Sequence, residues 1–443
     1  MRATRSALSA AADRHGALSV DAIGLSGQMH TMVLVDAEGR ALRPAITWMD
    51  TRAQAQLERL EALVESAGLA PELANPVVLG LTAPPLLWLI EQEPEVVESA
   101  EALLLAKDML RLRLTGRIGA EPTDVSATLL ADVAHRDWSA RAARAFGVPV
   151  RLLPPVSPSD AVAGPLTRQA AEELGLEPGI PVAFGAADQQ AAAVAMGTLS
   201  PGQAQLMVGT GAQVLAVRER PDADPRGCLH TFCHVRGYVQ QASVNNAGAA
   251  LDWVRELLGV SWERLYASPL AQPHLPAFVP YLSGERAPVM KGYARGAWLG
   301  LEPRHDVDAL LGAALTGVVT SIADAVAAVV RTGDVRGPVR ASGGGMREPR
   351  FAQAVSDATG LALEVVNRGS ASAVGAALLG GIAAGVHADP HAAAETLEGA
   401  EPLRYEPDPL TARAWLARRG WRAELDDLGL HEHVAKRPEE RPE

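Results

Sequence analysis

An apolar run that ends at a single carboxylate, in the middle of the chain, constrains the fold most. Residues 180–187 are apolar, Asp188 follows them, and an alanine-rich run continues over residues 189–196. A glycine turn at residues 209–211 then separates two further apolar stretches. This order predicts a strand, a carboxylate at the start of a helix, and a hairpin with a glycine tip. A candidate general base therefore stands close in the sequence to a candidate phosphate cradle. Phosphoryl transfer to a hydroxyl uses both.

Strand and helix signals alternate along the rest of the chain. Apolar residues at helical spacing predict helices over residues 3–15, 53–67, 101–114, 249–258, 306–330, 351–359 and 371–384. Apolar runs bounded by turn residues predict strands over residues 22–25, 32–35, 203–208, 212–217, 339–342 and 361–366. This alternation predicts the α/β class. A chain of 443 residues is long enough for two domains, which we expect over residues 1–180 and 181–443.

The composition argues against several classes of protein. The formal net charge is -12 and no run of Lys or Arg occurs, so a nucleic-acid partner is not expected. Two cysteines, Cys228 and Cys233, are too few for a disulfide framework, which favours free thiols and a cytoplasmic protein. The most membrane-like stretch, residues 310–330, contains Asp324 and many small residues. That favours a buried helix over a membrane span.

The position of Asp188 leaves two interpretations open. Asp is a favoured N-cap residue, and capping alone explains many carboxylates at helix starts. A helix N-terminus also favours the ionised carboxylate, and an ionised carboxylate can accept a hydroxyl proton during phosphoryl transfer. The motif by itself does not decide between a helix cap and a general base.

Two glycine segments are candidates for nucleotide binding. In Gly209-Thr210-Gly211, the backbone N–H groups and the Thr hydroxyl could face phosphate oxygens, although a plain hairpin turn is the alternative. Gly343-Gly344-Gly345 joins a predicted strand to a predicted helix, where a nucleotide could approach the backbone, or where glycine simply permits a turn. Neither a P-loop nor a Rossmann glycine fingerprint occurs in the chain.

Two loops near the start of the chain carry polar and aromatic groups. The first contains Gln28, Met29 and His30, and the second contains Trp48, Asp50 and Arg52. An aromatic ring beside charged groups suits a polyol, because the ring covers the carbon face and the charges bind hydroxyls. The alternatives are a structural histidine at His30 and a surface ion pair between Asp50 and Arg52.

Taken together, these segments resemble the FGGY family of carbohydrate kinases, and among them most closely the xylulokinases. The resemblance runs over nearly the whole chain and rests on the order and spacing of its segments. They are residues 24–30, 42–46, 48–50, 106–108, 110–111, 137–139, 229–234, 280–288 and 296–301.

The resemblance implies an actin-like fold of two ribonuclease H-like domains with a cleft between them. The N-terminal domain would bind the sugar and the C-terminal domain the nucleotide. It also implies transfer of phosphate from ATP, with Mg²⁺, to a pentulose such as D-xylulose, and a homodimer would be unsurprising for the family. By position, Asp188 matches the catalytic base, and the six residues of the two early loops match the sugar site. Gly209, Thr210 and Gly211 match a phosphate hairpin, and Gly343, Gly344 and Gly345 match the adenosine loop, with Gln353 near it.

The chain departs from the family pattern at its start. The family normally begins with a strand and hairpin that carry a Gly-x-Asp-x-Gly-Thr motif, the first phosphate loop, whose acidic residue helps to position magnesium. This chain starts after that point, so we expect the first domain to lack its N-terminal strands, and the metal ligands stay unknown. A non-catalytic sugar-binding or regulatory relative is therefore the alternative to an active kinase.

Overall fold

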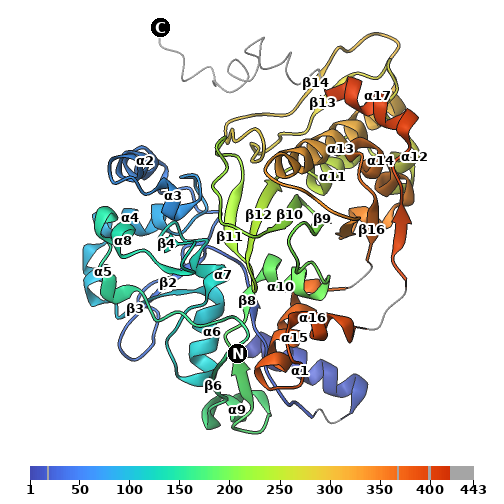
Figure 1. Cartoon of the computed structure of the whole chain (residues 1–443). Coiled ribbons are helices and arrows are strands. Elements are labelled where there is room, and N and C mark those ends of the chain that lie inside the picture. The colour runs from blue at the N-terminus through green and yellow to red at the C-terminus, as the bar shows by residue number, and fades with distance from the viewer. Residues whose placement is uncertain (17–18, 367–368, 398–400, 420–443) are drawn as a thin grey trace.

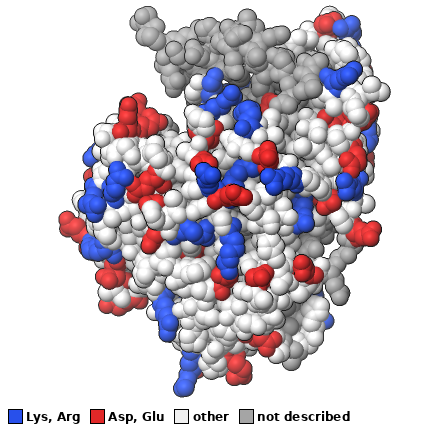
Figure 2. Space-filling model, in the orientation of Figure 1, with Lys and Arg blue, Asp and Glu red and all other residues white. Residues whose placement is uncertain are grey.

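The computed structural model describes residues 1–16, 19–366, 369–397 and 401–419. The two parts of the chain lie side by side, and the segment β8 (Ala186–Ala187) and α10 (Asp188–Ala195) lies between them (Figure 1). Figure 2 shows acidic and basic side chains interspersed over one face of the molecule, so the negative net charge does not gather into one patch there.

The first half of the chain is built on pairs of short strands. β1 (Ser26–Gly27) runs parallel to β8, whereas β2 (Met32–Val35) pairs antiparallel with β3 (Ala102–Leu105). The remaining pairs are β4 (Ala131–Asp132) with β5 (Asp137–Trp138), and β6 (Val162–Pro165) with β7 (Pro181–Ala183). The helices are α1 (Arg2–His15), α2 (Leu57–Ser66), α3 (Ala70–Leu73), α4 (Ala83–Gln92), α5 (Pro94–Ser99), α6 (Ala106–Thr115), α7 (Pro122–Val125), α8 (Ala140–Phe146) and α9 (Arg168–Leu174).

The second half of the chain is built on one seven-stranded mixed sheet. Its strand order is β11-β12-β10-β9-β15-β16-β17. The strands are β9 (Ala204–Val208), β10 (Ala212–Arg218), β11 (His230–Cys233), β12 (Tyr238–Val244), β15 (Val339–Ser342), β16 (Leu363–Val365) and β17 (Leu403–Tyr405). A separate pair joins β13 (Ala277–Val279) to β14 (Ala297–Leu299). The helices are α11 (Gly248–Leu257), α12 (Trp262–Ala267), α13 (Val307–Arg331), α14 (Pro349–Thr359), α15 (Ala371–Ala383), α16 (Pro390–Glu395) and α17 (Pro409–Arg419).

The longest helix, α13, forms the centre of the second half. By length and composition it could cross a membrane, but 83% of its most apolar window is buried inside the protein. It packs against β12, β13, α11 and α14 in the largest hydrophobic cluster. The prediction of a buried helix over residues 306–330 is therefore confirmed.

Helix α15 brings the end of the chain back to its beginning. It lies along α10 at backbone contact distance: a Cβ added to Gly375 would lie 1.7 Å from the Ala191 carbonyl oxygen. Likewise, a Cβ added to Gly24 would lie 1.6 Å from the Ala376 carbonyl oxygen. Only glycine permits this approach, so small residues fix the place of α10 between the two halves.

Several predicted elements differ from the structure. The helix predicted over residues 101–114 is wrong at its start, where β3 forms because β2 offers a partner for its apolar residues. The single strand predicted over residues 180–187 is two strands, separated at Gly185, which has a φ of 81°. In the strand predicted over residues 22–25, Ile23 makes only an isolated bridge, and the ladder follows in β1.

The expected domain boundary at residues 180 and 181 stays a prediction. Strands β7 and β8 follow it in sequence, yet they pair with β6 and β1, which precede it. The α/β class itself is confirmed by the alternation of helices and strands throughout the described chain.

Candidate active site

Asp188 is the first residue of α10, as the sequence predicts. The N-cap of this helix is Ala187, so Asp188 is one residue past the capping position, and its Oδ1 accepts the N–H of Gln189 at 2.8 Å. Among the described residues, no cation contributes to the pKa of this carboxyl group, which is shifted by burial and by hydrogen bonds at the helix start. Burial therefore raises the pKa of Asp188 without an opposing cation.

The two glycine segments line one cavity. β9 and β10 form the predicted hairpin around Gly209-Thr210-Gly211, and Gly343-Gly344-Gly345 follows β15, the strand next to β9. Gly209, Thr210, Gly344 and Gly345 border a cavity of about 630 Å³, within the usual range for small-molecule sites. A Cβ added at Gly209 or at Gly344 meets no protein atom within 4 Å, so the space beside them is open.

Gly343, the first residue of one segment, and Gly211, the last residue of the other, determine the shape of the loops. Gly343 has a φ of 104°, and a Cβ there would lie 2.3 Å from the Val208 carbonyl oxygen. A Cβ at Gly211 would lie 2.5 Å from the Val244 carbonyl oxygen. These two residues keep the backbones close together, whereas their neighbours present backbone to the cavity.

Sequence reasoning missed the aromatic wall of this cavity. Trp253, Trp262, Tyr266 and Phe351 line it, and Trp262 stacks on Tyr266 with ring centroids 5.6 Å apart. The first three come from α11 and α12, which are distant in sequence from both glycine segments. Flat aromatic faces beside exposed glycine backbone suit a planar base joined to phosphates, and the cavity therefore fits a nucleotide.

Gln353 lies apart from this cavity. Its amide nitrogen donates to Asp357 Oδ1 at 2.8 Å and to the Glu406 carbonyl oxygen at 2.7 Å. Phe351, two residues earlier on α14, lines the cavity in its place. Since side chains two apart on a helix do not share a face, the predicted role of Gln353 has no contact to support it.

The early loop around His30 lies beside the strand that leads to Asp188. Met29 is buried against Ala187 and Phe232, whereas Gln28 is exposed. His30 Nδ1 lies 2.8 Å from the Ala127 carbonyl oxygen, and burial lowers the pKa of His30 to about 4. The imidazole is therefore neutral at physiological pH, where it can exchange hydrogen bonds with sugar hydroxyls.

A second histidine accompanies His30. His230 stacks on Phe232 with ring centroids 5.3 Å apart, and His30 lies against the same ring at 6.0 Å. His230 Nδ1 is 3.2 Å from Asn75 Oδ1, and burial lowers the pKa of His230 to about 3. From the sequence, residues 229–234 are notable only through the family resemblance. Their contact with His30 could not be predicted, because β11 lies beside His30 only in the folded chain.

Trp48 meets a cation from the second half of the chain. The Arg286 guanidinium lies 5.5 Å from the centre of the Trp48 ring, and a Cβ added to Gly80 would lie 2.9 Å from Arg286 Nη2. Arg286 is also close enough to His30 and His230 to help lower the pKa of both. The loop that follows β13 thus covers the early loops.

Asp50 and Arg52 bind each other. Arg52 Nη2 lies 2.8 Å from Asp50 Oδ2, and the guanidinium sits over the Trp88 ring at 4.9 Å. Both side chains are partly exposed, as in the surface ion pair considered from the sequence. Their contribution to a sugar site stays a prediction.

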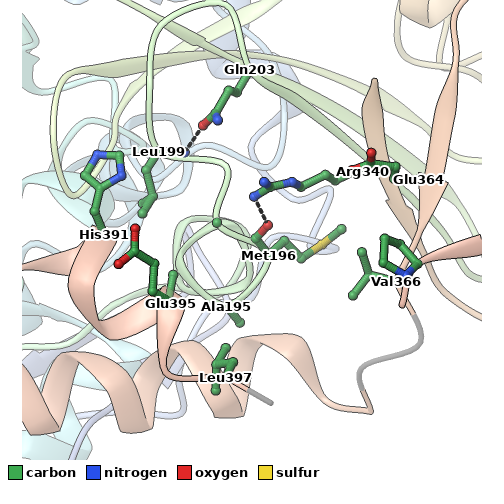
Figure 3. Close-up of a pocket in the computed structure, with 13 residues that line it drawn as sticks. Ala195, Met196, Leu199, Gln203, Arg340, Glu364, Val366, His391, Glu395 and Leu397 are labelled. Carbon is green, nitrogen blue, oxygen red and sulfur yellow. Dashed lines mark hydrogen bonds between the residues drawn. The ribbon is translucent and has the colours of Figure 1, made fainter. Parts of the chain in front are cut away.

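A second cavity, of about 480 Å³, lies at the other end of α10 (Figure 3). None of the predicted site residues lines it. In it Arg340 of β15 donates a hydrogen bond to the Met196 carbonyl oxygen, just after the last turn of α10. The strand that leads into Gly343 therefore also holds the far end of the helix that begins at Asp188.

Two family models match the chain. The N-terminal domain of the FGGY family of carbohydrate kinases matches residues 1–195, and the C-terminal domain of the same family matches residues 204–384. The chain belongs to the FGGY family of carbohydrate kinases. It is a sugar kinase with the two-domain fold of this family, whose members use ATP as the phosphate donor.

Curated relatives and solved structures agree with the family. The chain is 35% identical over 391 residues to a xylulose kinase of Escherichia coli, which covers 86% of this chain and 80% of the relative. It is 31% identical over 379 residues to a xylulose kinase of Bacillus subtilis, with 83% and 75% covered. A xyloylose kinase from Brucella ovis, 33% identical, superposes with a TM-score of 0.87 over 96% of this chain and 88% of that one. The fold is also that of a xylulose kinase from Lactobacillus acidophilus, 20% identical, with a TM-score of 0.90 over 97% and 88%.

Within the described ranges, no group of three or more His, Cys, Asp or Glu side chains is arranged to hold a metal ion. The cysteines are free and buried in β11 and beside it, as expected from the sequence.

Proposed function

We propose that this kinase phosphorylates a pentulose, D-xylulose in the first place, with ATP and Mg²⁺ and with Asp188 as the general base. The meeting of the two glycine segments at one nucleotide-sized cavity carries this proposal. The choice of sugar is supported by relatives that cover most of the chain and are xylulose kinases.

In this proposal, residues of the first half bind the sugar and residues of the second half bind the nucleotide. The sugar side consists of the six residues of the two early loops, which are Gln28, Met29, His30, Trp48, Asp50 and Arg52. Among them, Met29 is buried and packs beneath the loop against Ala187 and Phe232. Gly209, Thr210, Gly344 and Gly345 offer backbone N–H groups and one hydroxyl to phosphate oxygens. When bound, ATP with its magnesium supplies the γ-phosphoryl group, whose charge those donors would neutralise.

Asp188 accepts the proton of the sugar hydroxyl as the hydroxyl oxygen bonds to the γ-phosphorus of ATP, while the bond from that phosphorus to the β-phosphate oxygen breaks and ADP leaves. Desolvation raises its pKa, and a base with a pKa closer to the working pH accepts a proton more readily. Its place at the first position of α10 keeps the carboxylate near the positive end of that helix, which limits the rise. A positioned base of this kind contributes roughly 10²–10⁴-fold to the rate.

A coupled assay with ATP and a panel of ketoses and aldoses tests the proposal. D-xylulose should give the highest kcat/KM, and Asp188→Asn should lower kcat by roughly 10²–10⁴-fold while calorimetry still detects sugar binding. Asp389→Asn is a matched control, because Asp389 is an exposed carboxylate that caps α16. Full activity of the Asp188 variant would contradict its role. Pentulose binding without nucleotide binding or turnover would favour a non-catalytic sugar-binding relative.

A further inference from the structure

A buried hydroxyl holds the residue that precedes the proposed base. Thr123 of α7 accepts the Ala187 N–H on its Oγ1 at 2.8 Å and donates to Glu121 Oε1 at 2.7 Å. A carboxylate can only accept, so the direction of both hydrogen bonds is fixed. Thr123 and Glu121 are both fully buried, and water does not compete for either bond.

The acceptor behind Thr123 is itself immobilised. Glu121 caps α7 by accepting the N–H groups of Thr123 and Asp124, at 2.8 and 3.0 Å. Its Oε2 also accepts the Ser159 hydroxyl at 2.7 Å, and Lys107 Nζ lies 3.4 Å from Oε1. A carboxylate held from four directions is a rigid anchor, so the Thr123 hydroxyl has one position.

The strand that this hydroxyl holds is short, and the backbone N–H of Ala186 donates to the Leu25 carbonyl oxygen at 3.1 Å. β8 has two residues, and its ladder with β1 joins only Ser26 to Ala186 and Gly27 to Ala187. Asp188 follows directly, and the far end of α10 is tied to the second half through Arg340 (Figure 3). Near its first residue, therefore, the Thr123 hydroxyl adds a side-chain contact from the first half to the backbone bonds of β8 and to the packing of α10 on α15.

The same short segment also positions the sugar side. Ala127, two residues after the end of α7, offers its carbonyl oxygen to His30 Nδ1, and Ser126 Oγ accepts the Cys233 N–H at 2.9 Å. The segment from Glu121 to Ala127 thus contacts the backbone beside Asp188 and the side chain of His30. Asp188 is the proposed base, and His30 is one of the proposed sugar contacts.

We propose that Thr123 is a positioning residue, which aligns the Asp188 carboxylate with the sugar hydroxyl through the Ala187 N–H. The inference rests on the proposed role of Asp188 as the base. A displacement of about 1 Å in a reacting group can cost on the order of 10²-fold in rate, although the displaced group itself is unchanged. Loss of the hydroxyl should therefore lower kcat without weakening the binding of sugar or ATP.

Steady-state kinetics of Thr123→Val and Thr123→Ser test this. Val keeps the shape and removes the hydroxyl, so we expect kcat to fall roughly 10- to 100-fold while both KM values stay within about threefold. Ser keeps the hydroxyl and should retain kcat within about threefold. Thr320→Val is the matched control: Thr320 is equally buried, and its hydroxyl bonds only the Thr316 carbonyl within α13.

A second comparison covers the case in which Thr123→Val does not fold. Thr123→Cys and Thr123→Ser have nearly the same size, but sulfur is the weaker acceptor and donor, so Cys should give the lower kcat. Equal kcat for Cys and Ser, or wild-type kcat for Val, overturns the inference, as does a rise in KM that accounts for the loss. Asp188→Asn measured in parallel separates the two claims. If that variant is inactive while Thr123→Val is normal, only the role of Thr123 fails; if it is active, the proposed base fails.

Discussion

At the residue scale, the proposed role of Asp188 as the base makes the activity depend on the protonation of its carboxyl group. A base must be ionised before it can accept a proton, and burial raises the pKa of this carboxyl above its ordinary value of about 3.9. We therefore expect kcat/KM to fall, as the pH is lowered, at a higher pH than an ordinary Asp would give. A pH–rate profile, with the melting temperature followed over the same range, checks this. A profile that stays flat down to about pH 4 would contradict it.

The same desolvation has a consequence for stability. In the folded chain Asp188 binds its proton more tightly than in the unfolded chain, so stability declines as the pH rises through the folded pKa and stays lower above it. Asp188→Asn removes the buried charge. Its melting temperature at neutral pH should therefore equal or exceed that of the wild type, although its activity is lost.

Two adjacent glycines should respond differently to one added methyl group. Gly344→Ala meets no protein atom within 4 Å, so we expect an unchanged melting temperature and a KM for ATP raised several-fold as the methyl enters the cavity. Gly343→Ala forces a Cβ onto the Val208 carbonyl at a φ of 104°, so it should lower the melting temperature. Kinetics and thermal unfolding of both variants test this. An unaltered KM for ATP in Gly344→Ala would show that the nucleotide lies elsewhere.

At the element scale, α6 and α7 meet through charges that are wholly buried. Lys107 Nζ lies 2.8 Å from Asp108 Oδ1 and 3.1 Å from Asp124 Oδ2. Burial alone would lower the pKa of Lys107, but the surrounding carboxylates, including Glu121, raise it. Burial also raises the pKa of Asp124 to about 8. Two buried cations, Lys107 and Arg111, thus lie among the buried acids beneath the segment that contains Thr123, and Arg111 pairs with Asp108 at 2.6 Å.

Removal of the Lys107 cation should destabilise the fold strongly. Lys107→Met leaves Glu121 and Asp124 without their cation, whereas Asp108 keeps Arg111, and it should cost about 3–5 kcal/mol of unfolding free energy. Arg264→Met breaks an exposed pair with Asp308, and should cost about 0.2–1 kcal/mol. Denaturant unfolding compares the two. Lys107→Met with Asp124→Asn should recover part of the loss, and equal costs for the two single variants would contradict this explanation.

At the scale of the whole molecule, the two halves meet over the early loops. Arg286, from the second half, covers Trp48 and approaches His30, while α10 is held by residues of both halves. Since the proposed sugar residues and the proposed nucleotide residues come from different halves, the relative placement of the halves would determine whether the hydroxyl meets the phosphoryl group.

Loss of the contact between Arg286 and the Trp48 ring should weaken the binding of the sugar. Arg286→Gln removes the cation that covers Trp48, and we expect a KM for the pentulose raised about tenfold with little change in stability, since a partly exposed cation–π pair contributes about 0.5–1 kcal/mol. Arg255→Gln is the contrasting variant, because Arg255 lies over Trp262 within the second half, at 5.4 Å. Steady-state kinetics with varied sugar checks both variants. Equal sugar KM values for the two variants would contradict a special role for Arg286.

Short-range chemistry explains which features could be predicted. Asp188 begins a helix because an apolar run meets an alanine-rich run, and the hairpin at Gly209 follows from glycine between two apolar strands. The strand β3 was missed because its residues suit a helix until β2 supplies a partner. The family resemblance places Gln353 near the glycine loop, whereas in the fold its amide nitrogen donates to Asp357 and to the Glu406 carbonyl oxygen.

Local patterns in the chain are enough to predict the α/β class, the start of a helix at Asp188 and both glycine turns, since each depends on neighbours within a few residues. Which groups share a site follows only from the folded chain. The joining of the glycine turns at one cavity, the aromatic wall from α11 and α12, and the hold of Thr123 on Ala187 all unite residues distant in the chain. Such contacts depend on packing and burial, and local patterns of polarity do not encode them.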